Sequence, residues 1–135
     1  KKLSYEYFST VVELAKHSDI LLSILPGGQE TKGIVDAEVL KSLGPKGIFI
    51  NIGRGTSVNE NDLINSLSQE TIAAAGLDVY ESEPKVPKAL RELDNVVLLP
   101  HIGSATLQTR AAMGNLLLEN LNAFFSKKSL ISEVL

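Results

Sequence analysis

The sequence predicts an α/β fold in which a parallel sheet packs against helices. Short, nearly continuous apolar runs alternate along the chain with segments of helical periodicity, and glycine or proline residues separate them. Strands of a parallel sheet are buried on both faces, so they lack the polar alternation of half-exposed strands. We therefore expect a parallel sheet covered by helices on both faces, with a long helix near the carboxyl end of the chain.

Length and composition restrict the class of protein. The chain of 135 residues has the size of one domain, and 44% hydrophobic and 21% charged residues are typical of a globular core-forming protein. A net charge of −3 without a basic block argues against a nucleic-acid partner. The absence of cysteine excludes disulfides, thiolate nucleophiles and cysteine-ligated zinc, and it fits a reducing compartment. No apolar run approaches the roughly 20 residues of a membrane span.

Four apolar runs are expected to form the strands, and five segments are expected to form helices. The strand segments are 20–25, 47–51, 71–77 and 96–99. The helical segments are 10–17, 37–43, 59 or 61 to 67, 87–93 and 107–125. Three of these helices are preceded by a side chain that can cap a helix amino end: Asp36, either Asn59 or Asn61, and Thr106.

Polar residues follow each predicted strand at the point where the strand ends. They lie in segments 26–28, 53–55, 78–83 and 101–104. Ligands of open parallel sheets bind where loops leave the carboxyl ends of the strands. We therefore expect these four segments to form one site.

Arg54 stands between two glycines just after the second predicted strand. A guanidinium presented there can bind a carboxylate or phosphate through two parallel hydrogen bonds. The alternative is a tight strand-to-helix turn that carries a surface arginine.

His101 follows Pro100 directly after the fourth predicted strand. Imidazole titrates near physiological pH, which makes His101 a candidate acid or base; the alternative is a structural or solvated histidine. Glu83 lies in an acidic loop and would fix the tautomer of the imidazole if the two side chains meet. The alternative is an acidic loop that is simply solvated. The combination of Arg54, Glu83 and His101 at one sheet edge favours proton transfer on a carboxylate-bearing substrate.

Other chemistries lack their usual motifs. Neither Ser57 nor Ser104 stands in a Gly-x-Ser-x-Gly elbow, so acyl transfer has no nucleophile in its usual setting. The dinucleotide fingerprint Gly-x-Gly-x-x-Gly is also absent, and a redox reaction needs a cofactor.

Three ordered segments resemble the NAD(P)-dependent D-isomer-specific 2-hydroxyacid dehydrogenases, and further similarity extends along most of the chain. The three segments are 51–55 with 58–63, 75–84, and 100–106. Residues 43–47 and 120–126 are most similar to plant-type glyoxylate/hydroxypyruvate and hydroxyphenylpyruvate reductases. The resemblance implies a Rossmann-type sheet and the reduction of a small 2-oxo acid to the D-2-hydroxy acid with NAD(P)H.

The resemblance also implies a role for individual residues. Arg54 matches the clamp for the substrate carboxylate, His101 matches the proton donor to the 2-oxo oxygen, and Glu83, rather than Glu81, matches the hydrogen-bond partner of that histidine. Asp78 matches the residue that binds the nicotinamide carboxamide. The implied cofactor contacts are Leu25, Pro26, Ile52, Asp78, His101, Gly103 and Ser104.

The glycine-rich phosphate loop of the family lies upstream of its equivalent of Leu3. We therefore expect residues 1–105 to be the partial NAD(P)-binding domain of a longer enzyme and 106–135 to be a helix and tail that return to an absent substrate domain. The full-length enzyme is expected to be a cytoplasmic homodimer. Lys1 and Lys2 favour NADP over NAD, because two cations attract a 2′-phosphate. The alternative function is a truncated, non-catalytic domain that binds a nucleotide or a protein.

Overall fold

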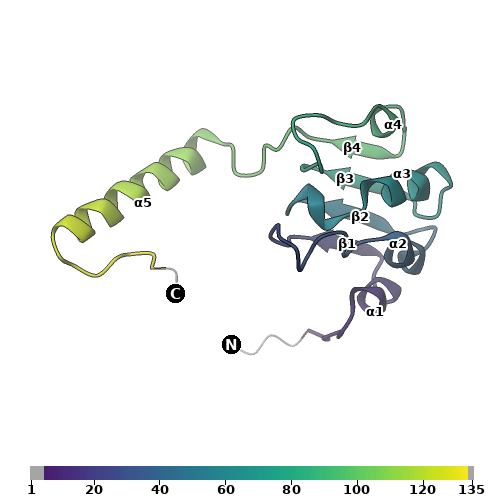
Figure 1. The fold of residues 1–135 in the computed structure, drawn as a ribbon, viewed down its shortest axis with the longest axis horizontal. Coiled ribbons are helices and arrows are strands. Elements are labelled where there is room, and N and C mark those ends of the chain that lie inside the picture. The colour runs from purple at the N-terminus through teal and green to yellow at the C-terminus, as the bar shows by residue number, and fades with distance from the viewer. Residues whose placement is uncertain (1–4, 134–135) are drawn as a thin grey trace. The chain divides into compact units, whose positions relative to one another are not determined.

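The structure is a computed structural model that describes residues 5–133, and it divides into two compact units between His101 and Ile102 (Figure 1). Lys1 and Lys2, on which the preference for NADP was based, lie outside the described residues. Among the helices of the described range, none combines the length and the hydropathy needed to cross a bilayer.

Four parallel strands form the sheet of the first unit and follow one another across it in chain order. They are β1 (Ile20–Ser23), β2 (Ile48–Asn51), β3 (Ala74–Leu77) and β4 (Val96–Leu98). The register aligns Ile20 with Ile48 and Ile48 with Ala74. The predicted α/β class and parallel sheet are thus confirmed, although each strand is shorter than the apolar run that predicted it.

The largest shortening affects the third strand, which was predicted from residue 71. The backbone N–H of Thr71 donates to the carbonyl of Ser66 over 2.8 Å, which turns the chain back towards the end of the preceding helix. Glu70 has a left-handed φ of 54° in the same turn. Residues 71–73 therefore belong to a turn, and regular strand geometry begins only at Ala74.

Side-chain caps fix where the helices of the first unit begin. The Asp36 carboxylate accepts hydrogen bonds from the backbone of Glu38 and Val39, and Asn59, rather than Asn61, caps the next helix. The helices are α1 (Val11–Lys16), α2 (Ala37–Leu43), α3 (Glu60–Ser68) and α4 (Lys88–Arg91), with a short 3-10 helix, η1 (Gly55–Ser57).

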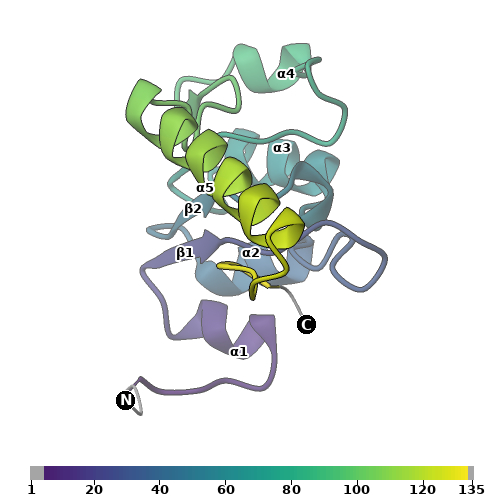
Figure 2. The same ribbon diagram turned by 90° about the vertical axis from the view of Figure 1, so that its left-hand side faces the viewer.

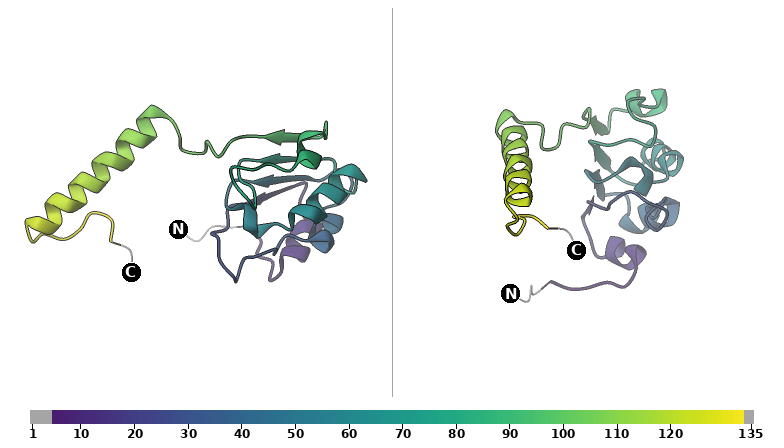
Figure 3. Two further views of the ribbon diagram at one scale, coloured as in Figure 1. Left: turned by 45° about the horizontal axis from the view of Figure 1, so that its top comes forward. Right: turned by 60° about the vertical axis from the view of Figure 1, so that its left-hand side comes forward.

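Helices α1 to α4 all lie on one face of the sheet, as the views in Figures 1 and 3 agree. Parallel strands are joined by right-handed crossovers, so connections that always step in the same direction place their helices, here α2 to α4, on the same face. Helix α1 precedes β1 and packs against α2. Because the order β1-β2-β3-β4 never reverses, the expectation of helices on both faces is wrong for this unit. The covered face holds the core, where Phe49, Leu40 and Leu63 are fully buried.

The second face of the sheet is apolar and exposed. Side chains alternate along β1: Leu21 is 5% exposed, whereas Ile20 and Leu22 are 55% and 52% exposed. On β4, Val97 is likewise exposed. Exposed aliphatic surface of this kind is a docking or aggregation surface in most proteins.

The second unit begins at Ile102 and contains the predicted long helix, α5 (Leu107–Phe125), with a short segment before it and another after it (Figure 2). The Thr106 hydroxyl caps the helix by accepting from the backbone N–H of Thr109, as predicted. Asn120 holds the following segment against the helix, because its Oδ1 accepts from the backbone N–H groups of Ile131 and Ser132. No residue of α5 is buried, although the helix carries large apolar side chains such as Met113 and Phe124.

Two substitutions on adjacent residues of β1 test the difference between the sheet faces. In the 135-residue chain, Leu22→Gln should change the free energy of unfolding by only about 1 kcal/mol and reduce binding of a hydrophobic dye. Leu21→Gln should lower that free energy by about 2–5 kcal/mol, because an amide replaces a buried side chain. Urea unfolding and dye fluorescence measure both effects, and equal losses in the two variants would contradict the assignment of faces.

Candidate active site

Backbone hydrogen bonds continue across the sheet at the carboxyl ends of the strands. The N–H of Ile52 donates to Ser23 over 3.1 Å, that of Asp78 to Asn51 over 3.0 Å, and that of Leu99 to Leu77 over 2.8 Å. The loops that follow the four strands therefore start side by side at one edge. This is the edge at which the sequence predicted a site.

The loop that carries Arg54 is held by two buried polar side chains. Asn51 accepts from the backbone N–H of Gly53 and donates to the Arg54 carbonyl over 3.1 Å. The Ser57 hydroxyl donates to the same carbonyl over 2.7 Å. Because three bonds fix the backbone around it, Arg54 projects from a rigid turn, and its own Nη1 donates to the Gly53 carbonyl over 2.7 Å.

Close backbone approach explains the glycine on each side of Arg54. A Cβ atom at Gly53 would lie 2.6 Å from the carbonyl oxygen of Leu25, in the loop after β1. A Cβ atom at Gly55 would lie 1.9 Å from the carbonyl carbon of Tyr80, in the loop after β3. Only residues without a side chain let the Arg54 turn pack against both neighbouring loops.

Glu83 and His101 meet at this edge. The Oε2 atom of Glu83 lies 2.7 Å from Nδ1 of His101, and the Oε1 atom accepts from the backbone N–H of Tyr80 over 2.9 Å. His101 has a left-handed φ of 53°, a strained conformation for a residue with a side chain. Such strain persists where the surroundings hold the residue in place, and it is concentrated at functional sites.

The pKa of Glu83 lies below its ordinary value, chiefly because His101 hydrogen-bonds to the carboxylate. Partial burial acts in the opposite direction, and the Tyr80 N–H and the positive charge of Arg54 add to the lowering. The carboxylate is therefore ionised at neutral pH and accepts the hydrogen bond, so Nδ1 of His101 carries the proton.

Arg54, Glu83 and His101 line one open pocket of 340 Å³. Within the described residues the Arg54 guanidinium forms no ion pair with a carboxylate, and 46% of the His101 side chain is exposed. The guanidinium of Arg54 and the imidazole of His101 thus line the same pocket. This arrangement can hold a small anion and exchange a proton with it.

The predicted cofactor contacts are divided between the two units of the structure. Leu25, Pro26, Ile52 and Asp78 follow β1, β2 and β3 at the same edge as the pocket. Ile52 is 53% exposed there, while Asp78 is buried. Gly103 and Ser104 belong to the second unit, where Ser104 has a left-handed φ of 63°.

Tyr80, Glu60 and Asn51 support the site, although the sequence singled out none of them for such a role. The backbone N–H of Glu81 donates to Glu60 Oε1 over 3.3 Å, and burial raises the pKa of Glu60. A polar residue at the end of a buried strand, such as Asn51, was the available signal. Its partners Gly53 and Arg54 are close in sequence. The contacts of Glu60 with Glu81 and of the Tyr80 hydroxyl with Leu99 join residues about 20 positions apart, so no local pattern indicated them.

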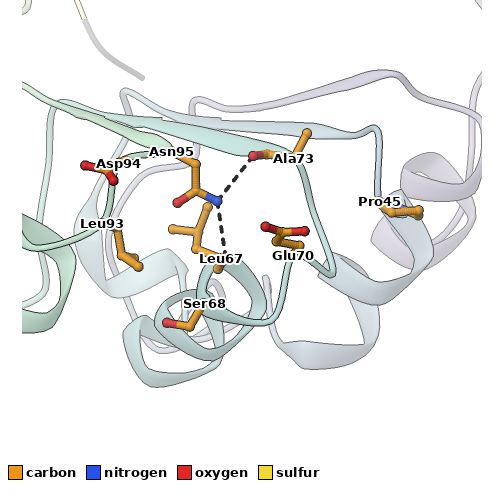
Figure 4. Close-up of a pocket in the computed structure, with 8 residues that line it drawn as sticks. All are labelled: Pro45, Leu67, Ser68, Glu70, Ala73, Leu93, Asp94 and Asn95. Carbon is orange, nitrogen blue, oxygen red and sulfur yellow. Dashed lines mark hydrogen bonds between the residues drawn. The ribbon is translucent and has the colours of Figure 1, made fainter.

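A larger hollow of 470 Å³ lies at the opposite edge of the sheet, where the strands begin (Figure 4). It includes Glu70, Asp94 and Asn95, and the Asn95 amide donates to the carbonyls of Leu67 and Ala73. In the part of the chain that the structure describes, no group of three or more acidic, histidine or cysteine side chains is arranged to hold a metal. The smaller pocket is the candidate site because the Arg, Glu and His side chains meet there.

A parallel sheet whose loops gather polar groups at the carboxyl edge belongs to the class of open α/β domains that bind their ligands at that edge. The family model for the NAD binding domain of D-isomer specific 2-hydroxyacid dehydrogenases matches residues 1–103. The chain belongs to this family of oxidoreductases, and the resemblance found in its motifs is confirmed.

Similar proteins cover nearly all of the chain. Glyoxylate/hydroxypyruvate reductase A of Arabidopsis thaliana is 51% identical over 132 residues, which is 98% of this chain and 42% of that protein. Hydroxyphenylpyruvate reductase of Plectranthus scutellarioides is 50% identical over 131 residues, 97% of this chain and 42% of that protein. The chain therefore spans less than half the length of the curated relatives that it matches.

The fold is also similar to solved structures. An NADPH-dependent glyoxylate/hydroxypyruvate reductase from Sinorhizobium meliloti, in complex with NADP and malonate, has a TM-score of 0.93 and 47% identity. That alignment covers 99% of this chain and 42% of the other. The family and this structure support NAD(P) as the cofactor class.

The lowered pKa of Glu83 makes stability depend on pH in a defined direction. The unfolded chain, in which a glutamate has a pKa of about 4.3, binds this proton more readily than the folded protein does. Stability that Glu83 contributes is thus complete above that value and is lost as the pH falls through the folded pKa. Chemical unfolding at several pH values should show a steeper loss below about pH 5 for the wild type than for Glu83→Gln. Parallel curves would contradict the Glu83–His101 bond.

Two glycine-to-alanine variants test the packing of the Arg54 turn. Gly55→Ala should lower the free energy of unfolding by about 1–3 kcal/mol, because the new methyl group overlaps the Tyr80 carbonyl. Gly76→Ala on β3 is the control, since its methyl group would meet Ile50 Cγ1 at 3.9 Å, an ordinary contact. Thermal unfolding compares them, and an equally stable Gly55→Ala variant would disprove the close approach.

Proposed function

We propose that the protein containing this chain reduces a small 2-oxo acid to the D-2-hydroxy acid with NAD(P)H. The observation that carries the proposal is the Glu83–His101 pair, bonded over 2.7 Å, in one pocket with the Arg54 guanidinium. Relatives described as glyoxylate/hydroxypyruvate reductases support the same reaction class.

Arg54 is proposed to bind the substrate carboxylate. A guanidinium fork matches a carboxylate through two parallel hydrogen bonds, which fixes the orientation of the acid as well as its position. The rigid turn around Arg54, held by Asn51 and Ser57, limits the rotation of the bound acid. Such positioning is a large part of the rate that an enzyme supplies.

His101 is proposed to donate the proton that the 2-oxo oxygen gains on reduction. Because Nδ1 is bonded to Glu83, Nε2 is the nitrogen that remains for this transfer. The hydrogen bond to Glu83 retains the proton on Nδ1 and thereby fixes the neutral tautomer after the transfer. A bound NAD(P)H supplies the hydride that the side chains themselves cannot carry.

The residues at the carboxyl edge fit the nicotinamide end of such a cofactor. Ile52 offers an exposed apolar side chain, and Gly53 lets the loops after β1 and β2 approach closely. We assign cofactor contacts to Leu25, Pro26, Ile52 and Asp78 of the first unit, together with His101; Gly103 and Ser104 complete the proposed set.

The proposal also specifies the substrate, the choice between NADP and NAD, the domains, the compartment and the oligomeric state. We propose glyoxylate or hydroxypyruvate as substrate and NADP rather than NAD, as in the NADPH-dependent relative. Residues 1–105 are proposed to be part of the cofactor domain, and 106–135 to pack against a substrate domain, in a cytoplasmic homodimer. The presence of Arg54, Glu83 and His101 together favours this function over a non-catalytic nucleotide-binding or interaction domain.

Turnover of the complete enzyme with glyoxylate or hydroxypyruvate and NADPH tests the proposal. His101→Gln should lower kcat by about 10²–10⁴-fold, because the proton donor is lost. Glu83→Gln should also lower kcat, whereas the control Glu81→Gln should have a much smaller effect, since Glu83 rather than Glu81 is the carboxylate hydrogen-bonded to His101, although both line the pocket. Unchanged turnover in His101→Gln would refute the assignment, and a much higher kcat/KM with NADH would reverse the choice of cofactor.

A further inference from the structure

Tyr80, in the loop after β3, joins the ends of two strands through its side chain. Its hydroxyl donates to the carbonyl of Leu99 over 2.7 Å and lies 3.3 Å from the carbonyl of Leu77. A phenol has one proton, so the shorter contact to Leu99 is the main bond. Leu99 lies two residues before His101, and the bond therefore fixes the start of the segment that carries the imidazole.

The backbone of Tyr80 holds the partner of that imidazole. Its N–H donates to Oε1 of Glu83 over 2.9 Å, while Oε2 of the same carboxylate faces Nδ1 of His101 over 2.7 Å. Both oxygens of Glu83 are thus engaged, and the carboxylate cannot rotate without breaking one of the two bonds.

The Arg54 turn rests on the same residue. The carbonyl carbon of Tyr80 occupies the place where a side chain at Gly55 would begin, 1.9 Å from an ideal Cβ position. Tyr80 is only 6% exposed and therefore has little room to move. Through its hydroxyl, its N–H and its carbonyl, one residue contacts or fixes all three loops that carry Arg54, Glu83 and His101.

We propose that Tyr80 is a positioning residue, whose hydroxyl fixes the His101 segment at Leu99 while its backbone holds Glu83 and the Arg54 turn. This inference rests on the proposed function, which gives those three side chains their roles. The strained φ of 53° at His101 needs such a restraint, because a free segment would relax towards negative φ.

The protonation of Tyr80 suits this role. Burial raises the pKa of the phenol, and the nearby charge of Asp78 raises it further. The hydroxyl therefore keeps its proton, and its bond to Leu99, at every pH at which an imidazole exchanges protons.

The Tyr80→Phe variant removes the hydroxyl and keeps the ring and the backbone N–H. Ile72→Val is the matched control, because it trims a fully buried side chain just before the opposite end of β3. Two signals of the 135-residue chain report on the pair without turnover: the NMR titration of the Glu83 carboxyl carbon and the resonance of the His101 Nδ1 proton.

In Tyr80→Phe we expect the titration midpoint of Glu83 to move up towards the ordinary glutamate range and the Nδ1 proton resonance to broaden. In the complete enzyme we expect kcat to fall about tenfold while KM for the 2-oxo acid changes less than twofold, since Arg54 still binds the carboxylate. Ile72→Val should leave the midpoint, the Nδ1 resonance and kcat as in the wild type.

An unchanged Glu83 midpoint and Nδ1 resonance in Tyr80→Phe would overturn the inference. So would an equal change in Ile72→Val, because the effect would then be a general loss of core packing. If the unmodified enzyme reduces no 2-oxo acid, the proposed function is refuted. The two NMR signals do not depend on turnover, so they still decide whether Tyr80 positions Glu83 and His101.

Discussion

The parallel pairing of β1 to β4 is the constraint on which the rest of the site depends. Because all four strands point the same way, their carboxyl ends share one edge, and loops that are distant in sequence start within hydrogen-bond reach of one another. Arg54 and His101 are 47 positions apart in the chain but line one pocket for this reason. An antiparallel arrangement of the same strands would place alternate loops at opposite edges.

Within that edge, contacts to the backbone give the side chains their fixed positions. Asn51 and Ser57 bind the backbone of the Arg54 turn, and the Tyr80 hydroxyl binds the backbone two residues before His101. Bonds to the main chain hold a turn in one conformation and leave its charged side chain available to a ligand. His101 keeps a strained, left-handed backbone conformation, and these bonds hold it in place.

The one-sided packing of the sheet follows from the same topology. Four strands in chain order place the connecting helices α2 to α4 on a single face, where α1 packs against α2, and the aliphatic side chains of the other face, such as Leu22 and Val97, are exposed. Helix α5 in the second unit likewise carries apolar side chains and no buried residue. Both elements therefore expose large apolar side chains that a globular core would bury.

The sequence by itself determined the features that depend on neighbouring residues. These include the α/β alternation, the capping of α2 by Asp36 and of α5 by Thr106, and the presence of Arg54, Glu83 and His101 in loops after strands. The resemblance to the family already implied that Glu83 meets His101, and the structure brings the two side chains together. The tertiary structure alone decided that Asn59 rather than Asn61 caps α3, that β3 starts at Ala74, and which face of the sheet the helices cover. Capping and periodicity act within a few residues and can be read locally, whereas strand order and contacts between loops depend on how the whole chain packs.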